Sequence, residues 1–444
     1  SKDGLINAKV ARALGSAMWM YDLTGGARIG KLHKRLKKAQ AVAHMPTLPE
    51  ERLAGAYLYY DAAADDARLT LALARTAALD HGAVVANHAA VVQLRHDDRG
   101  RVAGAVVEAD GRRIEVAARC VVNAAGVWSD MVRALDEGGD PDTIRPAKGI
   151  HITVPWSLVK NDIAVVVPVP KDRRSVFVVP WGDDGNGGFQ FTYIGTTDTD
   201  YDGPLDDPQC TPDDIAYLLR AINASVTTTI TEADVLGTWA GLRPLVRAAP
   251  SERTADLSRR HSVQVSRSGV VTVTGGKLTT YRRMAADATD EVAKLLGSGA
   301  KSRTKKVHIH GAVGWDADDL PRHLSSRYGG DARDVLALAR DPDLARPLAA
   351  GLPYLRAEVV YAVRCEMAAT VDDVLSRRTR ARLLARDASA AAADDVAALM
   401  AAELGWDEAE RRRQVEHYRA LVATERQAAG LPETILDTLS DRPT

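Results

Sequence analysis

Two segments of this chain share one pattern, and together they limit the folds open to it. Each runs from a short apolar strand through a turn of small residues into the start of a helix. The segments are Cys-Val-Val-Asn-Ala-Ala-Gly-Val-Trp-Ser-Asp at 120–130 and Val-Thr-Val-Thr-Gly-Gly-Lys-Leu-Thr-Thr-Tyr-Arg at 271–282. In an open α/β sheet, ligands bind beyond the carboxyl ends of the strands. We therefore expect the two segments to form two strand ends of one sheet.

The first turn leaves its backbone open to a ligand. Ala124, Ala125 and Gly126 carry no side chain that would block access, so a diphosphate could approach the N–H groups at the start of the helix. The same residues also fit a tight strand-to-helix turn that binds nothing. This turn alone does not decide between the two readings.

The second turn repeats this arrangement with more polar residues. Gly275 and Gly276 permit positive φ, and Lys277 adds a full positive charge. Thr279 or Thr280 can cap the helix that follows. The helix dipole would then favour an anion or the electron-rich edge of a reduced flavin, although a Gly-Gly-Lys turn is also common in plain surface loops.

Two titratable side chains stand in apolar segments. Arg243 lies in Thr-Trp-Ala-Gly-Leu-Arg-Pro-Leu at 238–245. A buried guanidinium needs an anionic partner, either a carboxylate of the chain or a ligand phosphate that matches its fork. His151 starts an apolar strand after Lys148 and Gly149. It can serve as a base near neutral pH, but strand histidines are more often structural.

Composition excludes several classes of protein. The formal net charge is −1 and aromatic residues make up 5% of the chain, so we expect no nucleic-acid partner. The three cysteines are far apart, which fits a reducing cytoplasm and predicts neither a disulfide framework nor a metal site. No apolar run reaches the roughly 18 residues of a membrane-spanning helix.

Pattern changes along the chain predict its organisation. Short β-rich runs at 150–155, 164–169, 175–181 and 189–196 predict an antiparallel sheet within a larger α/β framework. From residue 316 onward the periodicity is almost entirely helical. The compositional shift near residue 305 is the clearest domain boundary.

Six runs in fixed order carry a family resemblance. They are 121–128, 148–155, 176–181, 193–198, 240–245 and 275–282, preceded by Asp-Asp-Ala-Arg-Leu at 65–69. Together they resemble the FAD-dependent glycerol-3-phosphate dehydrogenases of aerobic glycerol metabolism, of the glycine-oxidase-like flavoprotein class. The resemblance is strong from about 60 to 300 and weaker beyond, where 358–378 is similar to the family's C-terminal domain. It implies a mixed α/β (α+β) FAD-binding fold with an antiparallel substrate-domain sheet and an all-α C-terminal domain. It also implies five segments: 1–60 substrate-domain or membrane-facing piece, 61–145 second part of the FAD-binding domain, 146–250 substrate-binding domain, 251–304 return to the FAD-binding domain, and 305–444 C-terminal helical domain.

The resemblance also implies a reaction and a site. The reaction is hydride transfer from C2 of sn-glycerol 3-phosphate to flavin, giving dihydroxyacetone phosphate, with electrons passed to a membrane quinone. Arg243 would bind the substrate phosphate, Lys277 would contact the substrate or the reduced flavin, and His151 would be the base. Arg259 resembles a second substrate arginine, with Arg260 as the alternative register. The residues expected to line FAD are Asn123, Ala124, Gly126, Gly275, Gly276, Lys277, Leu278 and Thr279.

Two departures from the family pattern bear on the cofactor. No Gly-x-Gly-x-x-Gly follows an early strand, and the family's Gly-Leu-Arg-Tyr segment is also absent. A family-length chain would carry roughly 130 further residues before Ser1. We therefore expect an N-terminally truncated member of the family, and we expect the chain as printed to bind FAD poorly or not at all.

The sequence leaves some alternatives open. A glycerol-3-phosphate oxidase shares these motifs but uses dioxygen, and a non-catalytic scaffold without FAD fits if Ser1 is the natural start. The expected location is cytoplasmic. A helix at 5–24 followed by the basic residues 28–38 could place the protein on the inner face of the cell membrane, or could be a packed helix with a solvated loop. A homodimer is also open.

One condition underlies the functional assignment. Arg243 and Lys277 should line a single cationic cavity beside the flavin. The assignment falls if these side chains turn away from each other or bind carboxylates of the chain itself.

Overall fold

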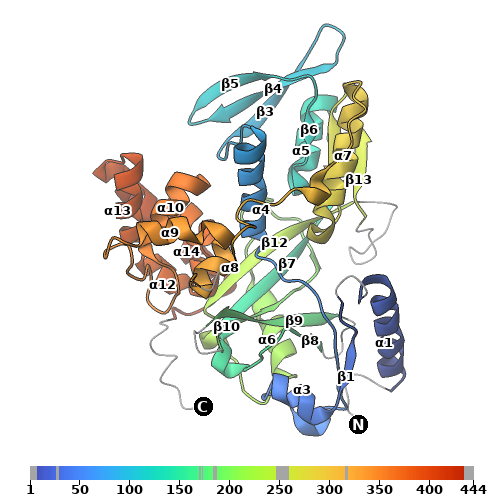
Figure 1. Ribbon diagram of the computed structural model, residues 1–444, viewed down its shortest axis with the longest axis vertical. Helices are drawn as coiled ribbons and strands as arrows, with labels where there is room; N and C mark the ends of the chain where they lie inside the picture. Colours follow the sequence, from blue (N-terminus) through green and yellow to red (C-terminus); the bar gives the residue numbers. More distant parts are fainter. Residues whose placement is uncertain are drawn as a thin grey trace.

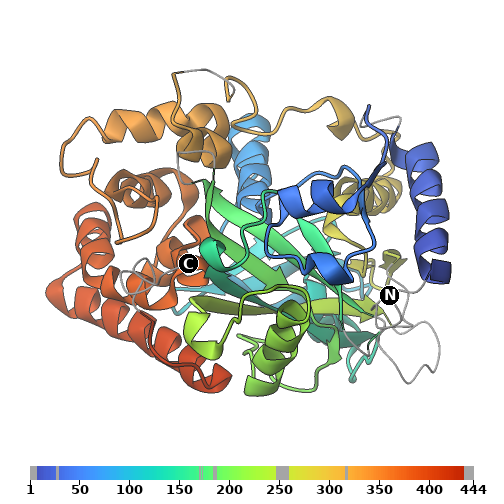
Figure 2. The same ribbon diagram turned by 90° about the horizontal axis from the view of Figure 1, so that it is seen from below.

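The computed structural model describes residues 8–26, 30–169, 172, 174–183, 188–246, 260–315 and 319–434. Two sheet regions form the centre of the molecule (Figures 1 and 2). Helices of the C-terminal region, orange to red, lie on one side of them, and α1 (Ala8–Tyr21), dark blue, lies on the other. In the described part of the chain, every helix is too short or too polar to cross a bilayer.

The larger sheet is antiparallel and is built around β7 (Ile144–Pro155). One edge of β7 pairs with β10 (Phe189–Gly195) and β11 (Thr199–Asp200), and the other pairs with β12 (Gly237–Val246). The sheet continues from β10 through β9 (Ser175–Asp183) to β8 (Val165–Pro168). The predicted antiparallel sheet is therefore confirmed.

One face of this sheet is sealed by α6 (Pro212–Asn223). The helix begins at Thr211, whose side chain caps it together with Asp214, and its apolar face buries Ile215 and Leu218. These residues share a core with Ile150 and other β-branched residues of β7. Because side chains alternate along a strand, the residues between them, including His151, lie on the opposite face.

The smaller sheet contains the two strand-turn-helix segments at 120–130 and 271–282. β6 (Val122–Asn123) lies parallel to β14 (Val271–Thr274), and β13 (Ser262–Val265) pairs with the other edge of β14. A helix follows each parallel strand: α5 (Ser129–Glu137) after β6 and α7 (Tyr281–Leu295) after β14. The expectation that these segments form neighbouring strand ends of one sheet is confirmed.

A meander of three strands extends from this region. It contains β3 (Ala90–His96), β4 (Val102–Ala109) and β5 (Arg112–Ala117), and it forms one end of the molecule in Figure 1. Leu94 and Val102 of the meander pack with Val270 beside β14.

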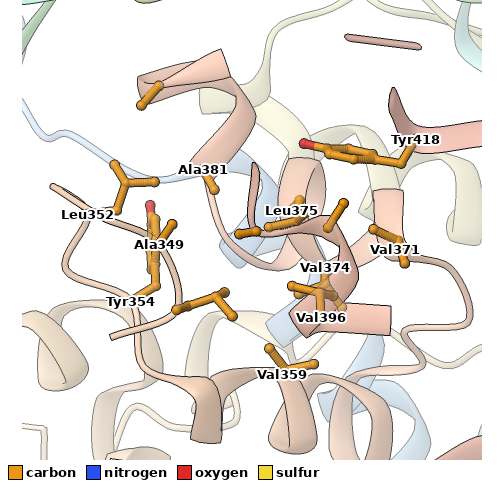
Figure 3. Close-up of a cluster of buried hydrophobic side chains, with 14 of the residues drawn as sticks. Ala349, Leu352, Tyr354, Val359, Val371, Val374, Leu375, Ala381, Val396 and Tyr418 are labelled. Atoms are coloured by element: carbon orange, nitrogen blue, oxygen red, sulfur yellow. The ribbon is translucent and has the colours of Figure 1, made fainter. Parts of the chain in front are cut away.

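The C-terminal region is helical, as predicted. Its helices surround a core that includes Val359, Leu375, Val396 and Tyr418 (Figure 3). Phe191 of β10 is part of the same cluster, so this core continues onto the larger sheet. The helices are α8 (Arg322–Tyr328), α9 (Ala332–Leu338), α10 (Arg356–Glu366), α11 (Ala381–Leu384), α12 (Arg386–Ala391), α13 (Ala393–Leu404) and α14 (Glu408–Ala429).

The N-terminal part contains short elements. β1 (Lys34–Leu36) pairs with β2 (Ala56–Leu58), and α3 (Lys38–His44) lies between them in sequence. The next helix, α4 (Asp66–Arg75), starts where the Asp65 carboxylate accepts a hydrogen bond from the Arg68 N–H at 3.1 Å. Acidic residues at this end also complement the helix dipole.

Several boundaries differ from the sequence-based expectation. The β-rich run from residue 83 predicts a strand that in the structure begins at Ala90, and the residues 231–236 predict a helix where the structure has one 3-10 turn, Glu232–Asp234. In that turn the Asp234 carboxylate accepts bonds from Thr231, which favours a tight turn over a longer helix. The long strand β12 was not predicted as a strand.

Candidate functional site

The turn after β6 is held open by hydrogen bonds of one buried side chain. The Asn123 amide donates to the Ser129 carbonyl at 2.9 Å, and its oxygen accepts from the Ala125 N–H at 3.3 Å. Gly126 follows with φ +61°, and a Cβ added there would meet nothing within 4 Å. Ala124 is exposed. The backbone of this turn is therefore accessible, as a cofactor diphosphate requires.

The turn after β14 needs its two glycines for steric reasons. Gly275 has φ +70°, and a Cβ there would lie 2.7 Å from the Arg260 carbonyl oxygen. Gly276 has φ +86°, and its Cβ would collide with Met284 Sδ. The Lys277 side chain follows on the exposed surface with Leu278 and Thr279. Across the described ranges, no carboxylate pairs with its ammonium group.

The open face of the larger sheet carries the other candidate residues. Trp239 lies opposite His151, Gly241 opposite Gly149, and Arg243 opposite Ala147. Directly opposed residues point to the same side of a sheet, and so do residues two apart. His151 and Arg243 therefore share one face, separated by a pair of glycines.

His151 lies within an aromatic enclosure. Its ring stacks on Trp239 with centroids 4.9 Å apart and meets the edge of Tyr193 at 5.9 Å. Nδ1 is buried and has no hydrogen-bond partner in the part of the chain that the structure describes. Burial, and then the positive charge of Arg243, lower the pKa of His151 from 6.5 to about 4. The imidazole is therefore neutral near pH 7 and able to accept a proton.

Arg243 lies over the backbone of Gly149. A Cβ at Gly149 would lie 2.7 Å from Arg243 Nη1 and 2.6 Å from Thr196 Oγ1. Arg243 Nη2 donates to that Thr196 hydroxyl at 2.9 Å, and Nη1 lies 3.3 Å from an Asp198 carboxylate oxygen. The guanidinium thus has a carboxylate of the chain beside it, which the sequence analysis counted against the phosphate assignment.

The Asp198 contact is longer than the bidentate pair that joins α4 to α10. The bidentate pair of Arg68 with Glu366 has N–O distances of 2.6 and 2.7 Å. A partly buried guanidinium needs an anionic neighbour when no ligand is bound, and the longer Asp198 contact meets that need without a bidentate bond. A ligand phosphate would provide closer acceptors.

β12 brings the sheet face and the strand-end turns together. It contacts the turn Gly126–Trp128 and the end of β14, and a Cβ at Gly275 would lie 3.1 Å from the Val246 side chain. Lys277 therefore lies on the edge next to the face that carries Arg243. Arg259 falls outside the described residues.

The C-terminal helices close one side of this face. Trp181 meets the edge of Tyr193 at 5.8 Å, and the Arg380 guanidinium carbon lies 5.6 Å from the centre of the Trp181 ring. Arg380 forms ion pairs with Asp65 at 2.7 Å and with Asp66 at 2.6 Å. α4 and the helical region thus meet at the border of the site.

Several of these residues were not predicted to belong to the site. Trp239 and Gly241 alternate in sequence with the predicted Arg243, and this period of two would have placed all three on one face if 237–246 had been recognised as a strand. Tyr193 and Thr196 lie in the run 193–198 that carries the family resemblance, but no local pattern assigns them to the site. Tyr193 reaches the site through the pairing of β10 with β7.

Metal chemistry has no candidate in the described ranges, where no three His, Cys, Asp or Glu side chains gather to hold an ion.

Two protein families match the chain. The family described as FAD dependent oxidoreductase matches residues 4–282, and the C-terminal domain of alpha-glycerophosphate oxidase matches residues 288–411. The boundary between the two matches lies within α7.

Individual relatives are similar over most of the chain. Glycerol-3-phosphate dehydrogenase of Mycobacterium leprae is 38% identical over 95% of this chain and 73% of its own length. The human mitochondrial glycerol-3-phosphate dehydrogenase is 34% identical over 90% of this chain and 58% of its own length. The structure of the glycerol-3-phosphate dehydrogenase from Bacillus halodurans complexed with FAD is 31% identical, with a TM-score of 0.76, over 87% of this chain and 79% of that one.

Proposed function

Because the chain belongs to the family of FAD-dependent glycerol-3-phosphate dehydrogenases, we propose that it oxidises sn-glycerol 3-phosphate to dihydroxyacetone phosphate and passes the electrons to a membrane quinone. The observation that carries the proposal is the sheet face on which a neutral His151 and a cationic Arg243 flank two glycines. A small phosphoester matches this arrangement, with an anion at one end and a hydroxyl at the other.

The strand-end turns fit the cofactor of the family. Asn123, Ala124 and Gly126 leave backbone N–H groups of the first turn accessible. Gly275 and Gly276, which adopt positive φ, have no side chains that would cover the second turn. Lys277, Leu278 and Thr279 extend this edge, and the helix that follows directs its positive dipole end toward it. Bound FAD would supply the hydride acceptor, and the chain would supply position and electric field.

Arg243 is proposed to bind the substrate phosphate. Its two terminal nitrogens already lie side by side near Thr196 and Asp198, and charge-assisted hydrogen bonds contribute about 1.5–3 kcal/mol each. Lys277 would add a second positive charge from the adjoining edge. Arg259 remains a proposed further substrate arginine.

His151 is proposed to take the proton of the C2 hydroxyl. Its buried Nδ1 has no hydrogen-bond partner among the residues described, and a buried polar atom without a partner is rare unless a ligand completes it. A correctly placed base contributes about 10²- to 10⁴-fold in rate. The aromatic rings of Trp239 and Tyr193 hold the imidazole in one orientation.

The assignment of Arg243 is tested by substitution in the FAD-loaded fraction of the protein, selected by flavin absorbance because we expect the chain as printed to bind FAD poorly. We expect Arg243→Met to raise KM for glycerol 3-phosphate by about 10- to 100-fold, corresponding to the loss of one charge-assisted contact. Competitive inhibition by inorganic phosphate should weaken in parallel. Arg411→Met, in an exposed pair on α14, is the control. An unchanged KM together with unchanged phosphate inhibition would contradict the role.

The electron acceptor is tested separately. The alternative is an oxidase, which the family matched by residues 288–411 brings into consideration. We expect turnover with a soluble quinone analogue and no stoichiometric peroxide. Peroxide formed in equal amount to dihydroxyacetone phosphate would identify dioxygen, and not a quinone, as the electron acceptor.

Peripheral membrane contact is part of the proposal, because a quinone resides in the bilayer. The supporting feature is an exposed apolar group, Trp19, Met20, Leu23 and Leu32, next to an exposed basic group. The basic group consists of Lys31, Lys34, Arg35, Lys37 and Lys38. Apolar insertion combined with attraction to anionic lipid is the usual basis of interfacial binding.

Liposome binding tests this surface. We expect binding to vesicles that contain anionic lipid, and we expect Lys34→Glu with Arg35→Glu to reduce it. Lys305→Glu with Lys306→Glu, equally exposed elsewhere, should leave binding unchanged. Equal binding by both double variants would contradict the assignment of this surface.

A further inference from the structure

The two glycines between His151 and Arg243 differ in the space around them. Gly149 of β7 lies opposite Gly241 of β12. Glycine inside a strand destabilises it, because the residue loses more backbone entropy on folding and has no side chain to pack. A glycine there therefore calls for a local physical reason.

At Gly149 the reason is steric. A Cβ there would collide with the Arg243 guanidinium and with the Thr196 hydroxyl. Gly149 is thus required by the position of Arg243, whether or not a ligand is present.

Gly241 has no such reason among the residues that the structure describes. Its φ lies outside the left-handed region, and an added Cβ would meet nothing within 4 Å. The residue is exposed on the face that carries His151 and Arg243. Neither backbone conformation nor packing excludes a side chain, so what a methyl group would occupy is the free space of the site.

We propose that Gly241 is a specificity-determining residue, whose missing side chain leaves room for the carbon chain of a short phosphoester lying between Arg243 and His151. This inference rests on the proposed function. Arg243 fixes the phosphate at one end and His151 fixes the reacting hydroxyl at the other, so the depth of the surface between them sets the height of the reacting carbon. A methyl group on that surface would lift the carbon away from its reacting position.

The test compares Gly241→Ala with Gly299→Ala in the FAD-loaded protein. Both positions have ordinary φ and open space around an added Cβ, so both variants should fold. We expect kcat/KM of Gly241→Ala for glycerol 3-phosphate to fall by about 100-fold, as misplacement by about 1 Å can produce. Inhibition by inorganic phosphate should be unchanged, because the phosphate binds at Arg243 and the position of Arg243 depends on Gly149. FAD content should equal that of Gly299→Ala.

The outcomes separate this inference from the function it rests on. An active wild type with an equally active Gly241→Ala variant would overturn the inference and leave the function standing. Loss of FAD from Gly241→Ala alone would assign the residue to the cofactor seat and also overturn it. A wild type that does not oxidise glycerol 3-phosphate would remove the proposed function, and this inference with it.

Discussion

At the scale of single residues, the site depends on a histidine kept neutral by its surroundings. Burial opposes the charged imidazolium, and Arg243 adds repulsion, so the pKa of His151 falls from 6.5 to about 4. The charged groups of other elements around it are Asp66 of α4, which raises the pKa, and Arg380, which lowers it. The imidazole is therefore neutral throughout the physiological range, and the same shift makes it a weaker base than an ordinary histidine.

This environment predicts a direct titration result. We expect His151 to remain neutral at pH 6 and to protonate only near pH 4, as followed by NMR of histidine-labelled protein. The signal is assigned by its absence from His151→Gln. A midpoint near 6.5 would show that the ring is solvated and would contradict the enclosure formed by Trp239 and Tyr193.

The same shift links pH to stability. His151 binds a proton near pH 6.5 in the unfolded chain and only near pH 4 in the folded chain. The contribution of the neutral imidazole to folding stability is therefore complete above about pH 6.5 and is lost as the pH falls toward 4. It amounts to about 3 kcal/mol at most. His151→Gln should therefore lose less stability than the wild type between pH 7 and pH 4.5 in urea unfolding.

At the scale of elements, the turn between β14 and α7 combines two demands on one residue. Gly276 adopts φ +86°, and Met284 from the first turns of α7 occupies the space of a Cβ. Positive φ costs a residue with a side chain about 1–2 kcal/mol, and overpacking adds about 1–3 kcal/mol. This turn is also proposed to hold the cofactor.

We therefore expect Gly276→Ala to destabilise the protein by about 2–4 kcal/mol and to weaken FAD retention, measured by thermal unfolding and by flavin fluorescence after dialysis. Adding Met284→Ala should recover the steric part only. Gly297→Ala has similar φ, +68°, with nothing near its Cβ, and should keep its FAD. Full FAD retention in Gly276→Ala would exclude this turn from the cofactor seat.

The elements that were predicted correctly have local signals, and those that were not depend on distant partners. β7, β9 and β10 are rich in β-branched and aromatic residues, and the parallel strands β6 and β14 each run into a small-residue turn, so their patterns predicted them. β12 contains Gly237, Ala240, Gly241 and Pro244, which disfavour a strand, and it is extended because β7 pairs along its whole length. The neighbours of His151 come from such pairings, so sequence alone identified the histidine without its enclosure.

At the scale of the whole molecule, largely buried charges join the helical region to α4, which borders the sheet face that carries His151 and Arg243. Arg68 of α4 binds Glu366 of α10, whose side chain is fully buried. Arg380, at the start of α11, binds Asp65 and Asp66 at the start of α4. α11 also lies directly on the larger sheet, where the Thr153 hydroxyl donates to the Leu383 carbonyl at 2.7 Å. The helical region thus forms a wall of the site, and its core continues onto the larger sheet.

Arg380 lies where the helical region borders the site. Arg380 contacts Trp181, Trp181 contacts Tyr193, and Tyr193 contacts the ring of His151. We expect Arg380→Met to loosen this chain of contacts and to lower kcat by about 10- to 100-fold, with little change in KM because Arg243 is untouched. Breaking the largely buried pair with Asp65 should also destabilise the fold by up to about 3 kcal/mol.

The control for Arg380→Met is Arg364→Met, which breaks a pair of similar length, 2.6 Å to Glu403, on an exposed surface of the same region. Exposed pairs contribute about 1 kcal/mol or less, so this variant should keep its kcat and most of its stability. A purely structural role for Arg380 predicts a lower unfolding temperature with normal kcat at temperatures where the protein stays folded. A fall in kcat under those conditions, with FAD content and KM unchanged, would mean that the helical region acts on the sheet face that carries His151 and Arg243. No residue that is proposed to bind substrate or cofactor is altered in Arg380→Met.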